Sequence, residues 1–283
     1  MDKRLVGLKR KNLVSRLEEL GSLLVAFSGG VDSTFLLALA HEALGENAVA
    51  ATSTSILHPL REREEASNFT RKRGILHVLF QSDEMGHPEI VRNGPDRCYH
   101  CKKILFQRLF AIAEEKGLKH VAHAANVDDL GDFRPGFKAA QEAGVIAPLI
   151  EAQLNKEEIR FLSREMGLPS WDKPAMACLA SRIPYGNPIT EKKLKMIEDA
   201  ETFLLKRGIR QVRVRRHGSV ARIEVGRSDL EKIIDKATRG AIVERLREIG
   251  FDHVSLDLEG FVSGSMNRIL KNKEKEPVKE SRE

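Results

Sequence analysis

One short stretch constrains the fold and the chemistry of this chain more than any other: Ser28-Gly29-Gly30-Val31-Asp32-Ser33. It follows an apolar run, 23–27, that is typical of a buried strand, and it precedes a second apolar run, 34–40, that is typical of a helix start. Adjacent glycines allow a sharp turn and close ligand approach, and a helix N-terminus offers unpaired N–H groups. The stretch therefore predicts an anion cradle.

The side chains of this stretch support a phosphate ligand. Ser28, Ser33 and Thr34 add hydroxyl donors, and Asp32 either caps the helix or holds a metal ion bound to the anion. A simple glycine turn with a polar cap is the alternative, but the strand-loop-helix context favours phosphate. The glycine and lysine spacing of a Walker loop is absent, because no lysine follows the glycines.

The composition indicates a cytoplasmic protein with two domains. The chain has 283 residues, 41% of them hydrophobic, and it shows neither a membrane-spanning apolar run nor a signal peptide. The net charge of +6 is spread among interspersed acids and bases, which is weak support for nucleic-acid binding. Three cysteines in such a chain argue against a disulfide scaffold and for catalytic or metal-bound thiolates.

Strand-like and helix-like segments alternate through the first two thirds of the chain. Strands are expected at 23–27, 48–53, 75–80, 120–124 and 145–149, and helices at 4–20, 34–40, 61–73, 98–116 and 155–167, with an irregular loop at 83–97. This alternation predicts an α/β fold with a parallel, doubly wound sheet, whose ligands bind at the carboxyl ends of the strands. Residues 1–184 are assigned to this domain.

A smaller α+β domain is expected over residues 185–265. It follows a proline-rich segment, 170–188, and contains helices at 191–207 and 230–249, a hairpin formed by 211–216 and 221–225, and a last strand at 253–258. The charged tail, 266–283, is nearly devoid of apolar residues beyond its start and is expected to be disordered.

The motif Cys98-Tyr99-His100-Cys101 opens the helix expected at 98–116. Two cysteines one helical turn apart can hold one metal ion or each other, and a helix N-terminus stabilises thiolates. A redox dithiol, half of a zinc site and part of an iron-sulfur cluster all fit this spacing, although the second pair that an all-cysteine zinc site needs is missing. His100 is more suited to an exposed or supporting role than to ligation.

The third cysteine, Cys178, lies in the loop after the last helix of the sheet domain. Its alanine and leucine neighbours are compatible with a buried apolar cysteine. The loop can also return over the carboxyl ends of the strands, toward the C-x-x-C pair. Three thiolates would leave one iron of a four-iron cluster open.

An acidic turn and an arginine-rich strand are further candidates. Asp128, Asp129 and Asp132 could hold Mg²⁺ and Arg134 could bind phosphate, with a capped Asp-rich turn as the alternative. We assign Asn126, Asp128 and Arg134 to ATP binding, and Asp32 and Asp129 to Mg²⁺. Strand alternation places Arg213 and Arg215, next to Arg216, on one face that suits a phosphate or carboxylate or is simply solvated. Glu201 and Glu224 are weaker candidates for a nearby acidic or metal site.

The glycine-rich stretch resembles the PP-loop of ATP pyrophosphatases, which implies adenylation of a substrate with release of pyrophosphate. Four motifs together resemble the LarE family of ATP-dependent sulfurtransferases, over about residues 10 to 265: SGGVDS, DDLGDFRPG, WDKPAMACLASRIPYG and VRVRRHGSVARIEV. The resemblance implies that a carboxylate of pyridinium-3,5-biscarboxylic acid mononucleotide is adenylated and converted to a thiocarboxylate for the nickel-pincer cofactor of lactate racemase.

The same resemblance implies two routes for the sulfur. In one subgroup the cysteine corresponding to Cys178 donates its own sulfur and becomes dehydroalanine. In another subgroup three cysteines hold a [4Fe-4S] cluster whose open iron carries an extra sulfide, and Cys98, Cys101 and Cys178 match that type. Arg213 and Arg215 match substrate-side arginines, and Mg²⁺ accompanies the ATP. The source of the sulfide is not implied.

Two other functions remain open. A tRNA thiolation enzyme of the PP-loop superfamily also joins such a loop to three cluster cysteines, but this chain lacks zinc-ribbon cysteine pairs and an aromatic-basic RNA platform. A non-catalytic module that senses ATP or a cluster would bind ATP without releasing pyrophosphate. We expect a homo-oligomer that acts on a small nucleotide, without a nucleic-acid or membrane partner.

Overall fold

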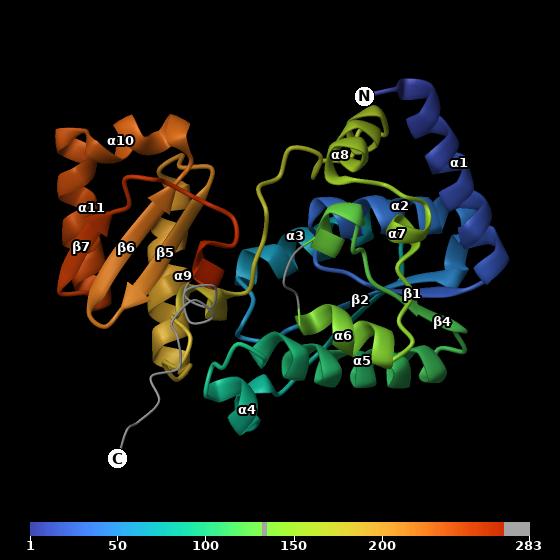
Figure 1. The fold of residues 1–283 in the computed structure, drawn as a ribbon, viewed down its shortest axis with the longest axis horizontal. Coiled ribbons are helices and arrows are strands. Elements are labelled where there is room, and N and C mark those ends of the chain that lie inside the picture. Colours follow the sequence, from blue (N-terminus) through green and yellow to red (C-terminus); the bar gives the residue numbers. More distant parts are fainter. Residues whose placement is uncertain (132–134, 269–283) are drawn as a thin grey trace, which may run out of the picture. The chain divides into compact units, whose positions relative to one another are not determined.

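The computed structural model describes residues 1–131 and 135–268. The chain divides into two compact units, which are described separately (Figure 1). The first comprises residues 1–90 and 96–177, and the second comprises residues 91–95 and the chain from residue 178 onward. The sequence placed the boundary after residue 184. From residue 269 on, the tail expected to be disordered lies outside the described residues.

The first unit is built on a parallel sheet with the strand order β3-β2-β1-β4. The strands are β1 (Leu23–Ala26), β2 (Ala48–Ser53), β3 (His77–Phe80) and β4 (His120–Ala122). In the centre of the sheet Leu24 is paired with Val49 on one side and Val121 on the other. β1 and β2 are almost fully buried, as expected for parallel strands with helices on both faces.

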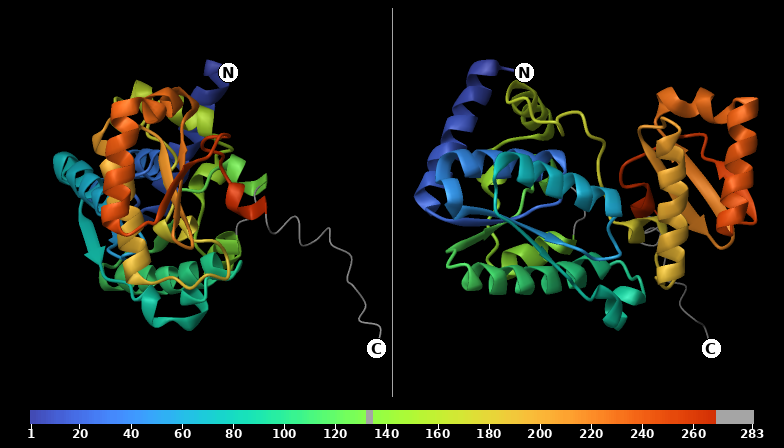
Figure 2. Two further views of the ribbon diagram at one scale, coloured as in Figure 1. Left: turned by 90° about the vertical axis from the view of Figure 1, so that its left-hand side faces the viewer. Right: turned by 180° about the vertical axis from the view of Figure 1, so that it is seen from behind.

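Two helix layers cover this sheet, and Figure 2 shows the sheet running between them. Leu23 and Val25 pack against a core formed with α1 (Lys3–Leu20), α2 (Val31–Leu44), α3 (Leu60–Arg73) and α8 (Lys156–Glu165). Leu24 and Val49 point the other way, into a core formed with α5 (Arg97–Glu115) and α6 (Pro135–Glu142). The predicted α/β class and parallel sheet are confirmed.

Three local predictions were wrong. The fifth strand at 145–149 is a single bridge between Ala122 and Ile146, because Pro148 instead starts the short helix α7 (Pro148–Glu151). The expected loop at 83–97 contains two helical turns, η2 (Glu84–Gly86) and α4 (Pro88–Val91), before α5 starts at Arg97. The single helix at 230–249 is divided at Asp235, whose side chain caps a new helix by accepting a hydrogen bond from Thr238 N–H.

The second unit has a three-stranded sheet with the order β5-β6-β7. Its elements are η4 (Leu179–Arg182), α9 (Glu191–Lys206), β5 (Val212–His217), β6 (Val220–Val225), η5 (Arg227–Asp229), α10 (Leu230–Ile234), α11 (Lys236–Ile249), β7 (His253–Leu256) and η6 (Ser265–Asn267). β5 and β6 form the predicted hairpin, and β7 lies parallel to β6. Val212 and Val214 face the core beneath α9 and α11.

A side chain explains why residues 91–95 belong to the second unit. Asn93 is fully buried, and its amide nitrogen lies 2.9 to 3.1 Å from the carbonyl oxygens of Ile183, Pro184 and Asn187.

Among the described residues, no helix has both the length and the apolar character needed to cross a membrane.

Candidate active site

The glycine-rich stretch forms the turn between β1 and the N-terminus of α2, as predicted. Gly29 adopts φ +72°, a backbone conformation that L side chains rarely take, and a Cβ there would lie 3.2 Å from the Cβ of Ala66. Gly30 is the N-cap residue of α2, so Val31, Asp32 and Ser33 form the first helical turn. Their N–H groups and the helix dipole make this turn suited to an anion.

Hydroxyl groups fix the shape of the loop. The Oγ atoms of Ser28 and Ser33 lie 3.0 Å apart, and Gly30 N–H donates to Ser28 Oγ over 3.3 Å. Ser33 Oγ–H in turn donates to the Gly30 carbonyl oxygen over 3.3 Å. These hydrogen bonds link exposed Ser28 to buried Ser33 and fix the turn between them.

A network of hydrogen bonds holds the residue just before the loop. Thr52 Oγ–H donates to the carbonyl oxygen of Phe27 over 2.6 Å, and the ring of His77 lies between Thr52 and Thr70, at 2.8 and 3.0 Å. Burial lowers the pKa of His77 to about 4, so the imidazole is neutral near pH 7. A neutral ring can donate to one threonine and accept from the other, which fixes the residue that precedes Ser28.

Two lysines reach the loop from distant parts of the chain. Lys156, the first residue of α8, forms an ion pair with Oδ2 of Asp32. Lys173 Nζ donates to the Gly29 carbonyl oxygen over 2.9 Å and forms an ion pair with Glu65 of α3. Each ammonium group is paired with a carboxylate at the loop, although no lysine follows the glycines in the sequence. Sequence reasoning missed both residues.

Asp32 lies in the first turn of α2 and is not the N-cap residue. Its Oδ1 atom is buried and has no hydrogen-bond partner among the described residues, whereas Oδ2 is held by Lys156. An unpartnered buried carboxylate oxygen is costly. The atom is suited to receive a cation or a donor that arrives with the ligand.

The turn after β4 is connected to the same lysine. It contains η3 (Val127–Gly131), in which Asp128 accepts a hydrogen bond from the backbone N–H of Lys156 over 2.9 Å. Asn126 accepts from Asp128 N–H, and Asp129 accepts from Asn126 N–H, both over 2.9 Å. Lys156 therefore joins Asp128 to Asp32. The other expected ligands of this turn, Asp132 and Arg134, lie outside the described residues.

Cys98 and Cys101 lie in the first two turns of α5, and both side chains are partly exposed. The guanidinium of Arg97 lies 3.6 Å from Cys98 Sγ. His100 donates through Nε2 to Asp96 over 3.0 Å. These positions leave both thiols accessible to a ligand.

The second unit holds Cys178 in front of a buried charge cluster. Cys178 is partly exposed and precedes η4, and its carbonyl oxygen accepts a hydrogen bond from Arg182 over 3.0 Å. Arg182 is 1% exposed and donates to both carboxylate oxygens of Glu201, over 2.8 and 2.9 Å. Glu201 also accepts from Val214 N–H over 2.9 Å. Glu201 is thus the partner that fixes the backbone next to Cys178.

The two predicted strand arginines are buried, which excludes a solvated strand face. Arg213 is 6% exposed, donates to the Val212 carbonyl oxygen and lies over the Phe261 ring, with 5.3 Å from its guanidinium carbon to the ring centroid. Arg215 is 8% exposed and forms a two-pronged ion pair with Glu224. It also donates to the carbonyl oxygen of Ser181, over 2.9 Å.

Arg215 faces a cavity of about 200 Å³ within the second unit. Arg182, Arg222, Arg268 and His217 also line it, together with the carboxylates of Glu224, Asp257 and Glu259. Burial, followed by the positive charges of Arg222 and Arg215, lowers the pKa of His217. Neither Arg213 nor Arg216 lines the cavity. The hairpin therefore presents Arg215 of β5 and Arg222 of β6 to this cavity, instead of Arg213 and Arg215 together.

The described residues contain no group of three or more His, Cys, Asp or Glu side chains placed to hold a metal ion. Cys98 and Cys101 belong to the first unit and Cys178 to the second, and each thiol is partly exposed. A buried carboxylate oxygen such as Asp32 Oδ1 is of the type that binds Mg²⁺, and one oxygen of Asp129 accepts a hydrogen bond from Asn126 N–H.

Known proteins with similar sequences include PP-loop proteins. A PP-loop domain family matches residues 6–94. An uncharacterised protein of Synechocystis is 43% identical over 93% of this chain and 98% of its own length. The pyridinium-3,5-bisthiocarboxylic acid mononucleotide synthase of Lactiplantibacillus plantarum is 36% identical over 93% of this chain and 95% of its own length.

A more distant relative matches a smaller part of the chain. One subunit of the glutamine-hydrolysing GMP synthase of Archaeoglobus fulgidus is 24% identical over 69% of this chain and 67% of that protein. The full-length match to the Lactiplantibacillus protein is far closer, and it confirms the resemblance that the four motifs indicated. The chain therefore belongs to the LarE family of PP-loop, ATP-dependent sulfurtransferases.

Proposed function

We propose that this enzyme adenylates a carboxylate of pyridinium-3,5-biscarboxylic acid mononucleotide and converts it to a thiocarboxylate for a nickel-pincer cofactor. The full-length similarity to a pyridinium-3,5-bisthiocarboxylic acid mononucleotide synthase supports this substrate. One structural observation carries the activation half of the proposal. Lys156 joins Asp32 of the loop to Asp128 of the β4 turn, at the carboxyl end of the sheet.

In the activation step, a carboxylate oxygen of the substrate attacks the α-phosphorus of ATP, and the bond to pyrophosphate breaks. The N–H groups of the α2 N-terminus, with Lys156 and Lys173, would receive the negative charge of the departing pyrophosphate. Asp32 Oδ1 would hold the accompanying Mg²⁺, which shields that charge. The product is an acyl-adenylate, in which AMP is the leaving group.

In the transfer step, a sulfur nucleophile attacks the acyl carbon, the bond to AMP breaks, and a thiocarboxylate forms. Cys98, Cys101 and Cys178 would hold a [4Fe-4S] cluster through three irons, and the cluster supplies a site for the incoming sulfide. Arg215 in its cavity would bind an anionic group of the substrate. Arg213 would act by supporting the strand, since its donors and its Phe261 contact hold it within the fold.

The experiment is an anaerobic purification with iron and sulfide analysis, followed by turnover with ATP and pyridinium-3,5-biscarboxylic acid mononucleotide. Mass spectrometry measures the thiocarboxylate and the intact protein, and a coupled assay measures pyrophosphate. We expect iron in the protein, several thiocarboxylates per chain and an unchanged protein mass. Cys98→Ser is expected to lose iron and turnover but retain pyrophosphate release.

Other outcomes decide between the alternatives. Loss of one sulfur from Cys178, without iron, would refute the cluster and assign Cys178 as a donor consumed once. ATP-dependent thiolation of tRNA, with no reaction of the pyridinium substrate, would refute the substrate. ATP binding without pyrophosphate release would instead identify a sensing module. Light scattering in the same preparation tests the expected homo-oligomer.

A further inference from the structure

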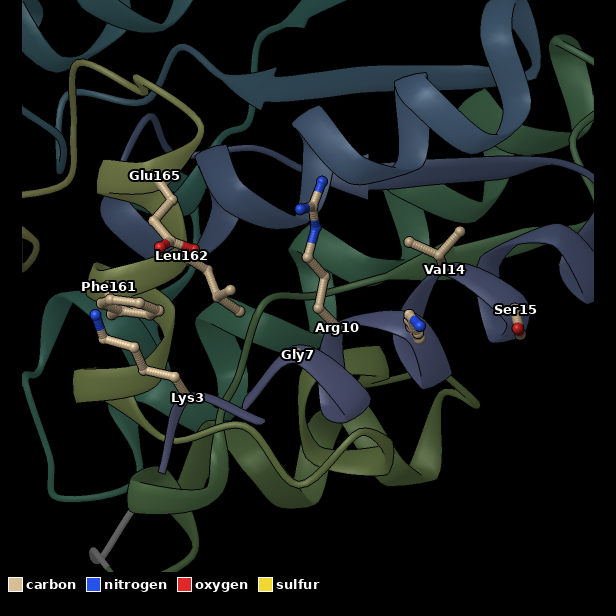
Figure 3. A pocket seen from close by; sticks show the side chains of 9 residues that line it. Lys3, Gly7, Arg10, Val14, Ser15, Phe161, Leu162 and Glu165 are labelled. Carbon is tan, nitrogen blue, oxygen red and sulfur yellow. The ribbon is translucent and has the colours of Figure 1, made fainter. Parts of the chain in front are cut away.

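A cavity larger than the one at Arg215 lies away from the PP-loop. It is a groove of about 620 Å³ between α1 and α8 of the first unit, seen from close by in Figure 3. Six of its nine lining residues come from α1, and the other three, Phe161, Leu162 and Glu165, come from α8. Its volume lies in the range of ligand-binding clefts, about 300 to 1,000 Å³. We call it the α1–α8 groove.

The α1–α8 groove is strongly basic along one helix. Lys3, Arg10 and Lys11 line it from α1, against the single carboxylate of Glu165. Within the described part of the chain, neither Lys3 nor Lys11 forms an ion pair, and Arg10 has only a loose contact of 3.8 Å with Glu42. The groove therefore offers unneutralised positive charge to an anionic partner.

Its floor is apolar. Val14 and Phe161 are partly buried hydrophobic side chains that pack against the core, and Leu162 is 3% exposed. The ammonium of Lys3 lies 5.6 Å from the centroid of the Phe161 ring, and Figure 3 shows the two side chains next to each other. A binding partner needs both carboxylates and apolar side chains.

Gly7 keeps the floor open. It lies inside α1, where glycine is less favourable than alanine by about 0.5 to 1 kcal/mol. A Cβ built at Gly7 meets no atom within 4 Å, so larger side chains fit there without disturbing the core. Gly7 thus adds no side chain to the groove that it lines.

We propose that the α1–α8 groove binds an acidic, amphipathic helical segment of a partner protein. Leucine-like side chains of that segment lie on Val14 and Phe161, and its carboxylates pair with Lys3, Arg10 and Lys11. A nucleic-acid backbone fits less well, because it offers no apolar side chains to the floor and would be repelled by Glu165. This binding function is additional to the sulfur transfer proposed above.

The test measures fluorescence anisotropy of a labelled synthetic 14-residue helix with leucines at i, i+3 and i+7 and glutamates beside them. We expect saturable binding to the full-length protein. Gly7→Gln fills the groove and is expected to weaken binding about tenfold or more, since the leucines lose their contact. The matched control Gly7→Ala also raises the helix propensity but leaves the groove open, and it should bind as the wild type does.

Reversing the charge of the groove lysines tests the proposal independently of Gly7. The double variant Lys3→Glu, Lys11→Glu is expected to weaken binding by at least about tenfold, because two attractions become repulsions. Lys72→Glu with Lys119→Glu makes the same change in net charge at exposed positions outside the groove and should leave binding unchanged. Pyrophosphate release should stay unchanged in all variants, which separates this proposal from the proposed function.

Three results would overturn the proposal. The first is equal binding of the peptide by the wild type, Gly7→Gln and the charge-reversed variant. The second is equally tight, groove-dependent binding of polyglutamate or tRNA, which would make the groove a general polyanion site. The third is concentration-dependent self-association that Gly7→Gln abolishes, which would assign the groove to a second copy of this chain.

Discussion

The PP-loop and the charge cluster behind Cys178 handle charge in opposite ways. In the loop, backbone N–H groups and two lysines surround a turn whose polar atoms stay accessible to a ligand, and one carboxylate oxygen of Asp32 is left without a partner among the described residues. In the cluster, Arg182 and Arg215 are buried and already hold Glu201 and Glu224. The loop thus keeps polar groups available for a charged ligand, whereas the buried arginines of the cluster are compensated by glutamates of the same unit.

This difference implies different consequences of substitution. Removing a group that contacts mainly the ligand should change the free energy of unfolding little. Its effect is expected in the kinetics of the reaction with ATP. A buried ion pair that loses one partner leaves a charge without compensation, so its loss is expected in the free energy of unfolding. Four measurements test this contrast, beginning with the largest expected effect.

Glu201→Ala should destabilise the second unit most. It leaves the guanidinium of Arg182 and the N–H of Val214 without their buried acceptor, at a cost of about 3 to 5 kcal/mol. Urea unfolding followed by circular dichroism measures this change. The control is Asp199→Ala on the same helix, whose ion pair with Lys195 is exposed and should contribute less than about 1 kcal/mol. Equal losses in the two variants would contradict the contrast.

Gly29→Ala should instead act mainly on catalysis. The new Cβ meets Ala66 at 3.2 Å and the residue must keep φ +72°, so the loop shifts its N–H donors. Misplacing such donors costs about 100-fold to 1,000-fold in rate. Pyrophosphate release measures it. Gly74→Ala is the control, because Gly74 ends α3 with a similar φ of +66° and an added Cβ there meets no atom within 4 Å. A comparable loss in that variant would show that backbone strain alone, and not the loop's donors, lowers the rate.

Lys156→Met should raise the KM for ATP about tenfold, with little change in the free energy of unfolding. The reason is that its ammonium faces the loop and its ion pair with Asp32 is partly exposed. Lys9→Met is matched to it, since Lys9 also contacts α8, through Glu158. Should Lys9→Met change the KM to the same extent, Lys156 would be acting only through the stability of α8.

The last measurement is the pH dependence of stability. Burial lowers the pKa of His58, His77 and His123 to about 4, well below the value of about 6.5 in an unfolded chain. Between these values the unfolded chain binds more protons, so stability should fall as the pH decreases from about 6.5 toward 4. His77→Gln should reduce this slope in urea titrations at several pH values. An unchanged slope would show that His77 is not protonated on unfolding in this range.

Prediction from the sequence succeeded where the signal is local. The strands around Ser28 are continuous apolar runs, and the loop follows from two glycines at a strand end, so both were found. Lys156 and Lys173 were missed because they reach the loop only through the fold, 124 and 144 residues away from the atoms they contact. One signal existed for Lys156, since the capping box of Asn155 and Glu158 marks Lys156 as the first residue of α8.

The arginine strand shows the opposite limit. Alternation correctly placed Arg213 and Arg215 on the face away from Val212 and Val214, but it cannot distinguish a face that binds a ligand from one that binds its own glutamates. Glu224 is directly opposite Arg213 in the register, yet it pairs with Arg215. The direction in which each side chain extends along the strand determines which arginine pairs with Glu224. Residue spacing does not reveal that direction.

The order in which the ATP site is assembled along the chain has a consequence for synthesis on the ribosome. The glycine turn is translated first, but Asp128, Lys156 and Lys173 follow roughly 100 to 140 residues later, or about five to thirty seconds at the usual rates. Until α8 and the segment beyond it emerge, the nascent loop lacks its cationic partners. We expect a growing chain of this enzyme to stay indifferent to cellular ATP until its first unit is complete.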